Sequence, residues 1–241
     1  MQIKPVAIFQ HTDVGHPGAV LPLLDQLSVP WVIIPIKDGA PVPQDPSPYS
    51  GLVFMGGAMG VNDGLQWVEE QKRLIRQADE QGLPIIGHCL GSQIMAAAFG
   101  AEVRLNRRVE IGWQTVNFND SPQAHEWFGE QPESCVFQWH ADTFDLPQNA
   151  VHLASSENCD NQAYVLNDRH LGMQFHLEMT PEIVRLCMEA NSAMMERELA
   201  AGNPAVNSQE ELLSHLDSRT AAMHRTMAAA YKRWVRGLKR D

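Results

Sequence analysis

One short segment, Gly-His-Cys-Leu-Gly at residues 87–91, most narrows the folds that are open to this chain. It follows an apolar run at residues 83–87 that is typical of a buried strand, and it precedes a helical pattern of small residues at residues 92–99. Glycine on both flanks lets the backbone turn sharply and pack where a Cβ would clash. The segment therefore predicts a strand, a tight turn and a helix in succession, which is a building unit of α/β folds.

Strand and helix patterns alternate elsewhere in the first hundred residues. Apolar runs predict buried strands at residues 6–9, 31–35, 51–55 and 83–87. Further helical patterns lie at residues 19–27 and 65–81. Strands joined through helices predict a doubly wound, mostly parallel sheet that is flanked by helices.

The middle of the chain changes character after residue 102. Strand-like runs follow one another with few helical patterns between them, at residues 135–139, 151–154, 163–166 and 171–175. Neighbouring strands without crossover helices are typically antiparallel. We therefore expect an antiparallel extension of the same sheet, within one domain.

Two helices are predicted after residue 180. Thr180 and Pro181 form a helix start, because threonine caps free N–H groups and proline fits the first helical position. This helix should end near residue 201. Ser208 and Glu211 should then form a capping box for a final helix. Its apolar residues fall near one face, and they are Leu212, Leu216, Met223, Met227, Trp234 and Leu238.

Composition excludes several classes of function. The formal net charge is −11, so the chain would repel nucleic acid. No apolar run is long enough to cross a bilayer, and the first residues lack the features of a signal peptide, so we expect no membrane association and a cytoplasmic location. The four cysteines form no C-x-x-C pair, and no phosphate-binding loop is present. We predict no cofactor and no metal site.

Cys89 is the cysteine whose surroundings suggest chemistry; we expect the other three to be apolar core residues. A strand, then Gly-x-Cys-x-Gly, then a helix is the pattern of a nucleophile elbow. The partial positive charge at the helix N-terminus favours a thiolate there. The N–H of Leu90 would face a developing oxyanion. On this segment alone, a cysteine buried between strand and helix remains the commoner interpretation.

A thiol nucleophile needs a base and a group that orients the base. The segment Gln-Phe-His-Leu-Glu at residues 174–178 offers both. In a strand, His176 and Glu178 would face the same side, so His176 could take the proton of Cys89 while Glu178 fixes its tautomer. Taken alone, the segment would more simply be a strand with a surface His–Glu pair.

Together these two segments resemble a known family. Gly-His-Cys-Leu-Gly-Ser-Gln resembles the nucleophile motif of class I glutamine amidotransferases, and Gln-Phe-His-Leu-Glu resembles their Gln-Phe-His-Pro-Glu motif. The order and the separation of 87 residues also match. The resemblance covers about residues 3–185 and looks closest to stand-alone amidotransferase-like proteins related to the glutaminase domain of GMP synthase. With the break in the helical pattern at residues 202–207, we expect residues 1–201 to form a catalytic domain and residues 202–241 a linker with an amphipathic helix.

The resemblance implies a role for each matching residue. Cys89 would attack the γ-carbonyl of glutamine or of a γ-glutamyl compound, with His176 as base and then acid and Glu178 orienting it. The N–H groups of Gly57 and Leu90 would form the oxyanion hole. The glutamyl group would be held by Gln93, Trp139 and His140.

Two positions depart from the family pattern. His88 stands where a small or apolar residue is usual. It should point away from Cys89 and therefore not replace His176, although it could alter the local field. Leu177 replaces the usual proline, which should loosen the backbone slightly. In the first loop, His11, Asp13 and His16 could line the rim of the site, but a solvated polar loop is the favoured interpretation.

The expected activity is hydrolysis of the glutamine side-chain amide, or of a γ-glutamyl bond, through a thioester on Cys89. Released ammonia would pass to an acceptor or a synthetase partner. Alternatives are a stand-alone γ-glutamyl peptidase or amidase and, with less support, a non-catalytic regulatory protein of the same fold. The final helix most simply packs on its own domain; otherwise it is an interface with a homodimer mate or a synthetase.

Overall fold

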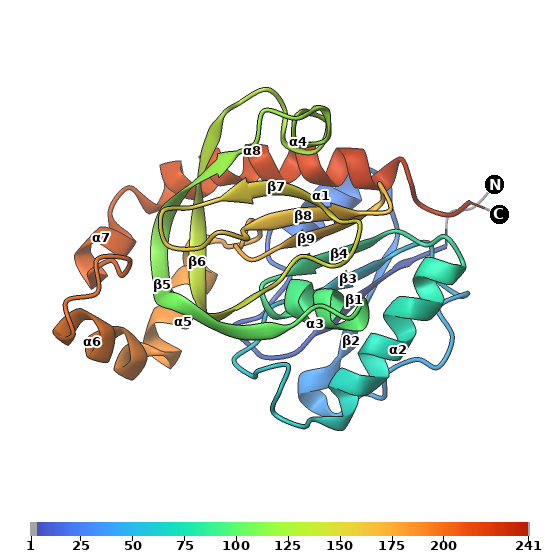
Figure 1. The fold of residues 1–241 in the computed structure, drawn as a ribbon, viewed down its shortest axis with the longest axis horizontal. Coiled ribbons are helices and arrows are strands. Elements are labelled where there is room, and N and C mark those ends of the chain that lie inside the picture. The colour runs from blue at the N-terminus through green and yellow to red at the C-terminus, as the bar shows by residue number, and fades with distance from the viewer. Residues whose placement is uncertain (1–3, 241) are drawn as a thin grey trace.

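The computed structural model describes residues 4–240, and these residues form a mixed sheet of nine strands. Its strand order is β2-β1-β3-β4-β9-β8-β7-β5-β6 (Figure 1). The strands are β1 (Val6–Gln10), β2 (Trp31–Pro35), β3 (Leu52–Phe54), β4 (Ile85–His88), β5 (Val103–Phe118), β6 (Glu133–Phe144), β7 (Val151–Ser155), β8 (Ala163–Leu166) and β9 (His170–Met173).

The sheet has a parallel half and an antiparallel half. Strands β2, β1, β3, β4 and β9 pair in parallel, whereas β9, β8, β7, β5 and β6 pair antiparallel. The predicted α/β fold, a doubly wound and mostly parallel sheet with an antiparallel extension, is therefore confirmed. The carboxyl end of β4 lies at the centre of the sheet, which places the turn after His88 there.

Helices cover both faces of the sheet. They are α1 (Val20–Gln26), α2 (Gln66–Glu80), α3 (Leu90–Ala98), α4 (Pro122–Phe128), α5 (Pro181–Ala190), α6 (Ser192–Ala200), α7 (Gln209–Leu213) and α8 (Leu216–Val235), with a short 3-10 helix at Ile36–Asp38. Alternate residues of β1 enter two separate cores: Val6 and Ile8 pack with α1, α5 and α8, and Ala7 and Phe9 pack with α2 and α3. Within residues 4–240, no helix combines the length and the apolar character needed to cross a bilayer.

The C-terminal segment differs from the prediction in two places. The single helix expected over residues 180–201 is broken at Asn191, whose side-chain amide donates to the carbonyl of Cys187 at 2.8 Å. Asparagine competes for backbone groups in this way, so α5 ends and α6 begins. The capping box of Ser208 and Glu211 forms, but it caps the five-residue α7. The chain re-enters a helix only after His215, which has a φ of +52°.

The final helix, α8, is part of the core. Its apolar stripe is buried, and Trp234 with Leu238 packs so closely on Gly51 that a Cβ there would lie within 3 Å of both side chains. Figure 1 shows α8 crossing the sheet, while α6 and α7 extend beside β5 and β6. The predicted division of the chain into a catalytic domain (residues 1–201) and a C-terminal segment (residues 202–241) stays a prediction.

Some elements were missed or misjudged from sequence. The longest strand, β5, was not predicted, because its first half is rich in arginine and exposed side chains. Helix α4 was also missed, although Ser121 caps it and Pro122 opens it. Cys135 is exposed on β6 rather than in the core, because its side chain points away from the core at that position of the strand.

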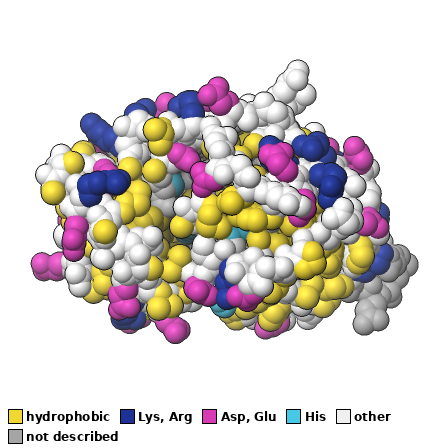
Figure 2. Space-filling model, turned by 90° about the horizontal axis from the view of Figure 1, so that it is seen from below, with side chains coloured by type: hydrophobic (Ala, Val, Ile, Leu, Met, Phe, Trp, Pro, Cys, Tyr) yellow, Lys and Arg dark blue, Asp and Glu magenta, His cyan; other side chains and the backbone are white. Residues whose placement is uncertain are grey.

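Seen from below, apolar side chains gather across the middle of the face, with histidines between them (Figure 2).

Candidate active site

Cys89 lies in the turn between β4 and α3 with a strained backbone. Its φ of +46° and ψ of −109° are rare for a residue with a side chain. The two flanking glycines make the turn possible: a Cβ on Gly87 would lie 2.6 Å from the backbone of Gly91, and one on Gly91 would lie 2.1 Å from the carbonyl oxygen of Phe54. The geometry is that of a nucleophile elbow at the N-terminus of a helix.

His176 and Glu178 lie beside this elbow. Nδ1 of His176 is 2.6 Å from Oε1 of Glu178, and the N–H of Leu177 donates to Oε2 of Glu178 at 2.9 Å. Strand β9 ends at Met173, so the strand expected through residue 175 is too long. A backbone pairing of His176 with Phe137 of β6 holds the segment instead. The two side chains meet because the chain bends back, and not because a strand alternates.

The electrostatics of the group favour an ion pair. Burial by itself favours neutral imidazole, but the Glu178 carboxylate and the Cys89 sulfur outweigh it and raise the pKa of His176 to about 10. Burial likewise opposes ionisation of Glu178, yet the rings of His176 and His88 hold the pKa of this carboxyl well below its usual range. A protonated His176 beside an ionised Glu178 is the state that this arrangement stabilises.

Two glutamines extend the contacts of the sulfur. Nε2 of Gln174 lies 3.6 Å from Sγ of Cys89, and Nε2 of Gln93 donates to Oε1 of Gln174 at 3.1 Å. Sγ also lies 3.8 Å from the carbonyl oxygen of Trp139. Gln93 lines the cleft with its amide N–H directed at protein groups, and its role in holding the glutamyl group stays a prediction. No role was predicted for Gln174 from the sequence. Its place as the first residue of the Gln-Phe-His-Leu-Glu motif was the one signal that could have pointed to its contact with Cys89.

The predicted oxyanion residues lie next to each other. Leu90 is the first residue of α3, so its N–H has no acceptor within the helix. A Cβ on Gly57 would lie 2.8 Å from Cδ2 of Leu90, and a Cβ on Gly56 would lie 2.7 Å from Cε1 of His176. Both glycines border the site, and Gly56 is the one directly against the imidazole.

An open cleft of about 200 Å³ leads to Cys89 and His176. Its walls are mainly apolar, and none of the described residues that line it is a lysine or an arginine. They include Val14, Ala58, Met59, Phe137, Trp139, Met179 and Met194. Asp142 also lines it, and burial together with the nearby Asp63 carboxylate raises the pKa of Asp142. An unpaired acid in a concave site is a candidate for binding a cationic group.

The break between α5 and α6 forms part of this cleft. Cys187 of α5, Asn191 at the break and Met194 of α6 line it. Burial, and then the charge of Cys89, raises the pKa of Cys187 to about 12, so this second cysteine stays a thiol and does not compete as a nucleophile.

Polar residues of the first loop do not line the cleft, although Val14 and Gly15 do. His11 is buried, with its ring nitrogens 2.9 Å from the carbonyl oxygen of Met55 and 3.0 Å from Oε1 of Gln71. Burial lowers the pKa of His11, despite these hydrogen bonds. Asp13 is exposed and pairs with a lysine, and His16 accepts the N–H of Gly18.

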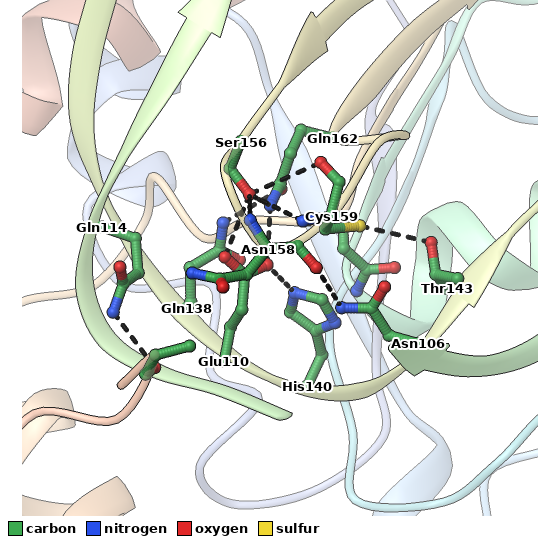
Figure 3. A network of polar contacts seen from close by, with 12 residues as sticks. Asn106, Glu110, Gln114, Gln138, His140, Thr143, Ser156, Asn158, Cys159 and Gln162 are labelled. Atoms are coloured by element: carbon green, nitrogen blue, oxygen red, sulfur yellow. Dashed lines mark hydrogen bonds and ion pairs between the residues drawn. The ribbon is translucent and has the colours of Figure 1, made fainter. Parts of the chain in front are cut away.

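His140 lines the cleft, and its side chain enters a buried polar network (Figure 3). Its Nε2 lies 2.9 Å from Oε2 of Glu110, which also accepts from Gln162 at 2.8 Å, and Oε1 accepts from Ser156 at 3.0 Å. Glu110, His140 and Cys159 offer ligand atoms within 4.8 Å of one another. Each already has hydrogen-bond partners in the chain, so the network ties β5 to β6 and requires no metal.

His88 makes two contacts that the sequence did not predict. It points away from Cys89, as expected, but it reaches the far oxygen of Glu178, with Nδ1 2.9 Å from Oε2. Its Nε2 lies 2.9 Å from the hydroxyl of Tyr231 in α8. Both side chains are fully buried.

Comparison with known proteins gives the context for this site. Residues 19–194 match the family model described as "Glutamine amidotransferase class-I". A crystal structure of a glutamine amido transferase from Methylobacillus flagellatus is 39% identical, with a TM-score of 0.93 over 100% of this chain and 97% of that one. Gamma-glutamyl peptidase 3 of Arabidopsis thaliana is 26% identical over 70% of this chain and 72% of its own length. One subunit of the glutamine-hydrolyzing GMP synthase of Sulfolobus acidocaldarius is 33% identical over 54% of this chain and 68% of its own.

Proposed function

Because this chain belongs to the class I glutamine amidotransferase family, we propose that it hydrolyses a γ-glutamyl bond through a covalent thioester on Cys89. The observation that carries the proposal is the buried set of Cys89, His176 and Glu178, in which the pKa of His176 is raised to about 10. A strained nucleophile, a protonated base and an orienting carboxylate are the components that acyl transfer by a cysteine needs.

The reaction follows from these positions. The thiolate of Cys89 adds to the γ-carbonyl carbon, and the N–H groups of Leu90 and Gly57 stabilise the oxyanion. The imidazolium of His176 then protonates the departing nitrogen, the C–N bond breaks and a γ-glutamyl thioester remains. Neutral His176 takes a proton from water, whose oxygen attacks the thioester, and glutamate leaves while the thiolate is restored.

We further propose how the glutamyl group is held. Gln93 and the backbone of Trp139 and His140 border the position of the γ-carbonyl. The carboxylate of Asp142 would pair with the α-ammonium of the glutamyl group, which is favoured because no basic side chain lines the described cleft.

The character of the cleft favours a stand-alone γ-glutamyl peptidase or amidase over ammonia transfer. A small, polar product such as ammonia needs no apolar wall, whereas an organic leaving group gains from one. Here Met59, Met179 and Met194 border the site, and Cys187 of α5 and Met194 of α6 in the same chain line it. Similarity to gamma-glutamyl peptidase 3 supports this choice.

Glutamine hydrolysis with delivery of ammonia to a synthetase is the second candidate. The observation that favours it is the similarity to a single subunit of GMP synthase, whose name implies that a separate partner completes that enzyme. In this case Asp142 and Gln93 keep the same roles, and the acceptor would dock over the cleft. A homodimer and a cytoplasmic location stay predictions.

One experiment tests the chemistry and the choice of substrate together. Purified wild-type protein and Cys89→Ala are incubated with glutamine and with γ-glutamyl peptides, and released glutamate is measured. Wild-type protein should release glutamate without any partner, and faster from peptides with apolar leaving groups. Equal rates for the two proteins would contradict the proposal, as would the absence of a Cys89 adduct, by mass spectrometry, with a glutamine-derived electrophile; that result would support a regulatory role.

A further inference from the structure

Two buried polar side chains, His88 and Tyr231, have no part in the reaction described above. His88 nevertheless contacts the orienting carboxylate of Glu178, and Tyr231 contacts His88. His88 and Tyr231 are fully buried, and they form a line from α8 to Glu178. The distances are 2.9 Å from the Tyr231 hydroxyl to Nε2 of His88 and 2.9 Å from Nδ1 of His88 to Oε2 of Glu178. Glu178 therefore lies between two imidazole rings, with one on each carboxylate oxygen.

The arrangement follows from the strand that carries the nucleophile. Side chains alternate along β4, so the residue before Cys89 points to the face opposite the cleft. That face is covered by α8, which brings Tyr231 to the ring of His88 at a centroid distance of 6.1 Å. Helix α8 lies outside the matched family region of residues 19–194.

A carboxylate that is only 1% exposed depends on protein groups for its hydrogen bonds. Oε1 of Glu178 faces His176, and Oε2 has the N–H of Leu177 and the ring of His88. The approach of His88 is close, although its direction is poor for a hydrogen bond. Only a protonated Nδ1 can face a carboxylate at this distance without repulsion.

For a neutral His88, this requirement also decides whether Nε2 donates or accepts a hydrogen bond. When Nδ1 of a neutral His88 carries the proton, Nε2 must accept, and the Tyr231 hydroxyl is its donor. Burial, and then the charge of Glu178, raises the pKa of Tyr231, so the hydroxyl keeps its proton. The titratable groups that face Glu178 are His176, His88, Tyr231 and Cys187.

We propose that Tyr231 and His88 are positioning residues of the active site: Tyr231 selects the tautomer of His88 that holds Glu178 in place, and Glu178 in turn orients His176. The final helix, α8, thus helps to set the geometry of the active site through Tyr231. The inference rests on the proposed function for its kinetic readout, and its second readout does not depend on the substrate.

The test compares Tyr231→Phe with Thr220→Val. The first removes one hydroxyl from the line; the second removes a buried hydroxyl of α8 that bonds only to carbonyls of its own helix. We expect kcat of Tyr231→Phe to fall about tenfold with KM unchanged, the effect of one hydrogen bond in a charged network. Thr220→Val should keep the wild-type kcat. Thermal unfolding of both variants shows whether stability alone differs.

The second readout is the alkylation of Cys89 by iodoacetamide as a function of pH. It requires the thiolate of Cys89 but no glutamyl substrate, so it separates failure of this inference from failure of the proposed function, and it is read on the Cys89 peptide by mass spectrometry because Cys135 is also a free, exposed cysteine. The midpoint of the profile should move to higher pH in Tyr231→Phe and stay in place in Thr220→Val. An unchanged kcat together with an unchanged profile would overturn the proposal.

If Tyr231→Phe does not fold, two variants of His88 carry the test. His88→Asn keeps an N–H donor near the position of Nδ1, and His88→Leu removes it. We expect His88→Asn to retain several times more activity, with the alkylation profile nearer to that of the wild type. Equal profiles and rates for the two variants would contradict a role in holding Glu178.

Discussion

A Cβ on Gly91 would lie 2.1 Å from the carbonyl oxygen of Phe54, so the helix that carries the nucleophile turn packs directly on the backbone of the neighbouring strand. This contact sets the depth at which α3 meets the sheet. It also sets the position of Cys89, which lies between β4 and α3.

Gly91→Ala should therefore destabilise the protein by more than about 2 kcal/mol, because neither backbone can move aside without disturbing the sheet. Gly237→Ala is the matched control, since its Cβ would meet only ordinary contacts, the nearest at 3.4 Å. Urea unfolding measures both. A similar free energy of unfolding for the two variants would show that α3 can shift.

Glu178→Gln should lower kcat/KM at least about a hundredfold, because the amide neither stabilises the imidazolium nor fixes its tautomer. Oε1 of Glu178 is 2.6 Å from Nδ1 of His176, so the substitution acts on this contact with little change in volume. Steady-state kinetics with the best γ-glutamyl substrate provide the measurement. Loss of less than about fivefold would mean that Glu178 does not orient His176.

The contact between His176 and Glu178 also makes the free energy of unfolding depend on pH. The pKa of His176 is raised from 6.5 to about 10, so its contribution is complete below about pH 6.5 and is lost as the pH rises towards 10. The pKa of Glu178 is lowered, so its contribution is complete above about 4.5 and is lost in acid. The wild type should exceed Glu178→Gln in unfolding free energy most clearly near pH 5.5, and a constant difference from pH 5.5 to 10 would argue against the ion pair.

Asp142→Asn should raise KM for glutamine about tenfold and leave kcat nearly unchanged, because it removes the acid that we assign to the α-ammonium group. The control is a second substrate: glutaramic acid, which is glutamine without its α-amino group, should be processed equally by both proteins. If Asp142→Asn weakens the binding of both substrates alike, the carboxylate has a structural role instead.

The sequence indicated much of the site because its signals are local. Glycines on either side of Cys89, and a histidine two residues before Glu178, can be recognised without knowing the contacts they make. The alternation of apolar runs with helical patterns was enough to predict a mostly parallel sheet with an antiparallel extension. Strand β5 could not be found in this way, since Arg104, Arg107 and Arg108 are exposed and mask the apolar period.

Contacts between distant residues were decided only by the tertiary structure. Nothing local relates His88 to Tyr231, which is 143 positions further along, or Gln93 to Gln174. The sequence determined which groups have the chemistry for acyl transfer, at a turn that only glycines permit. The packing of α8 against β4 and of β6 against the segment at His176 decided which of those groups touch, because burial of separate apolar faces brings them together.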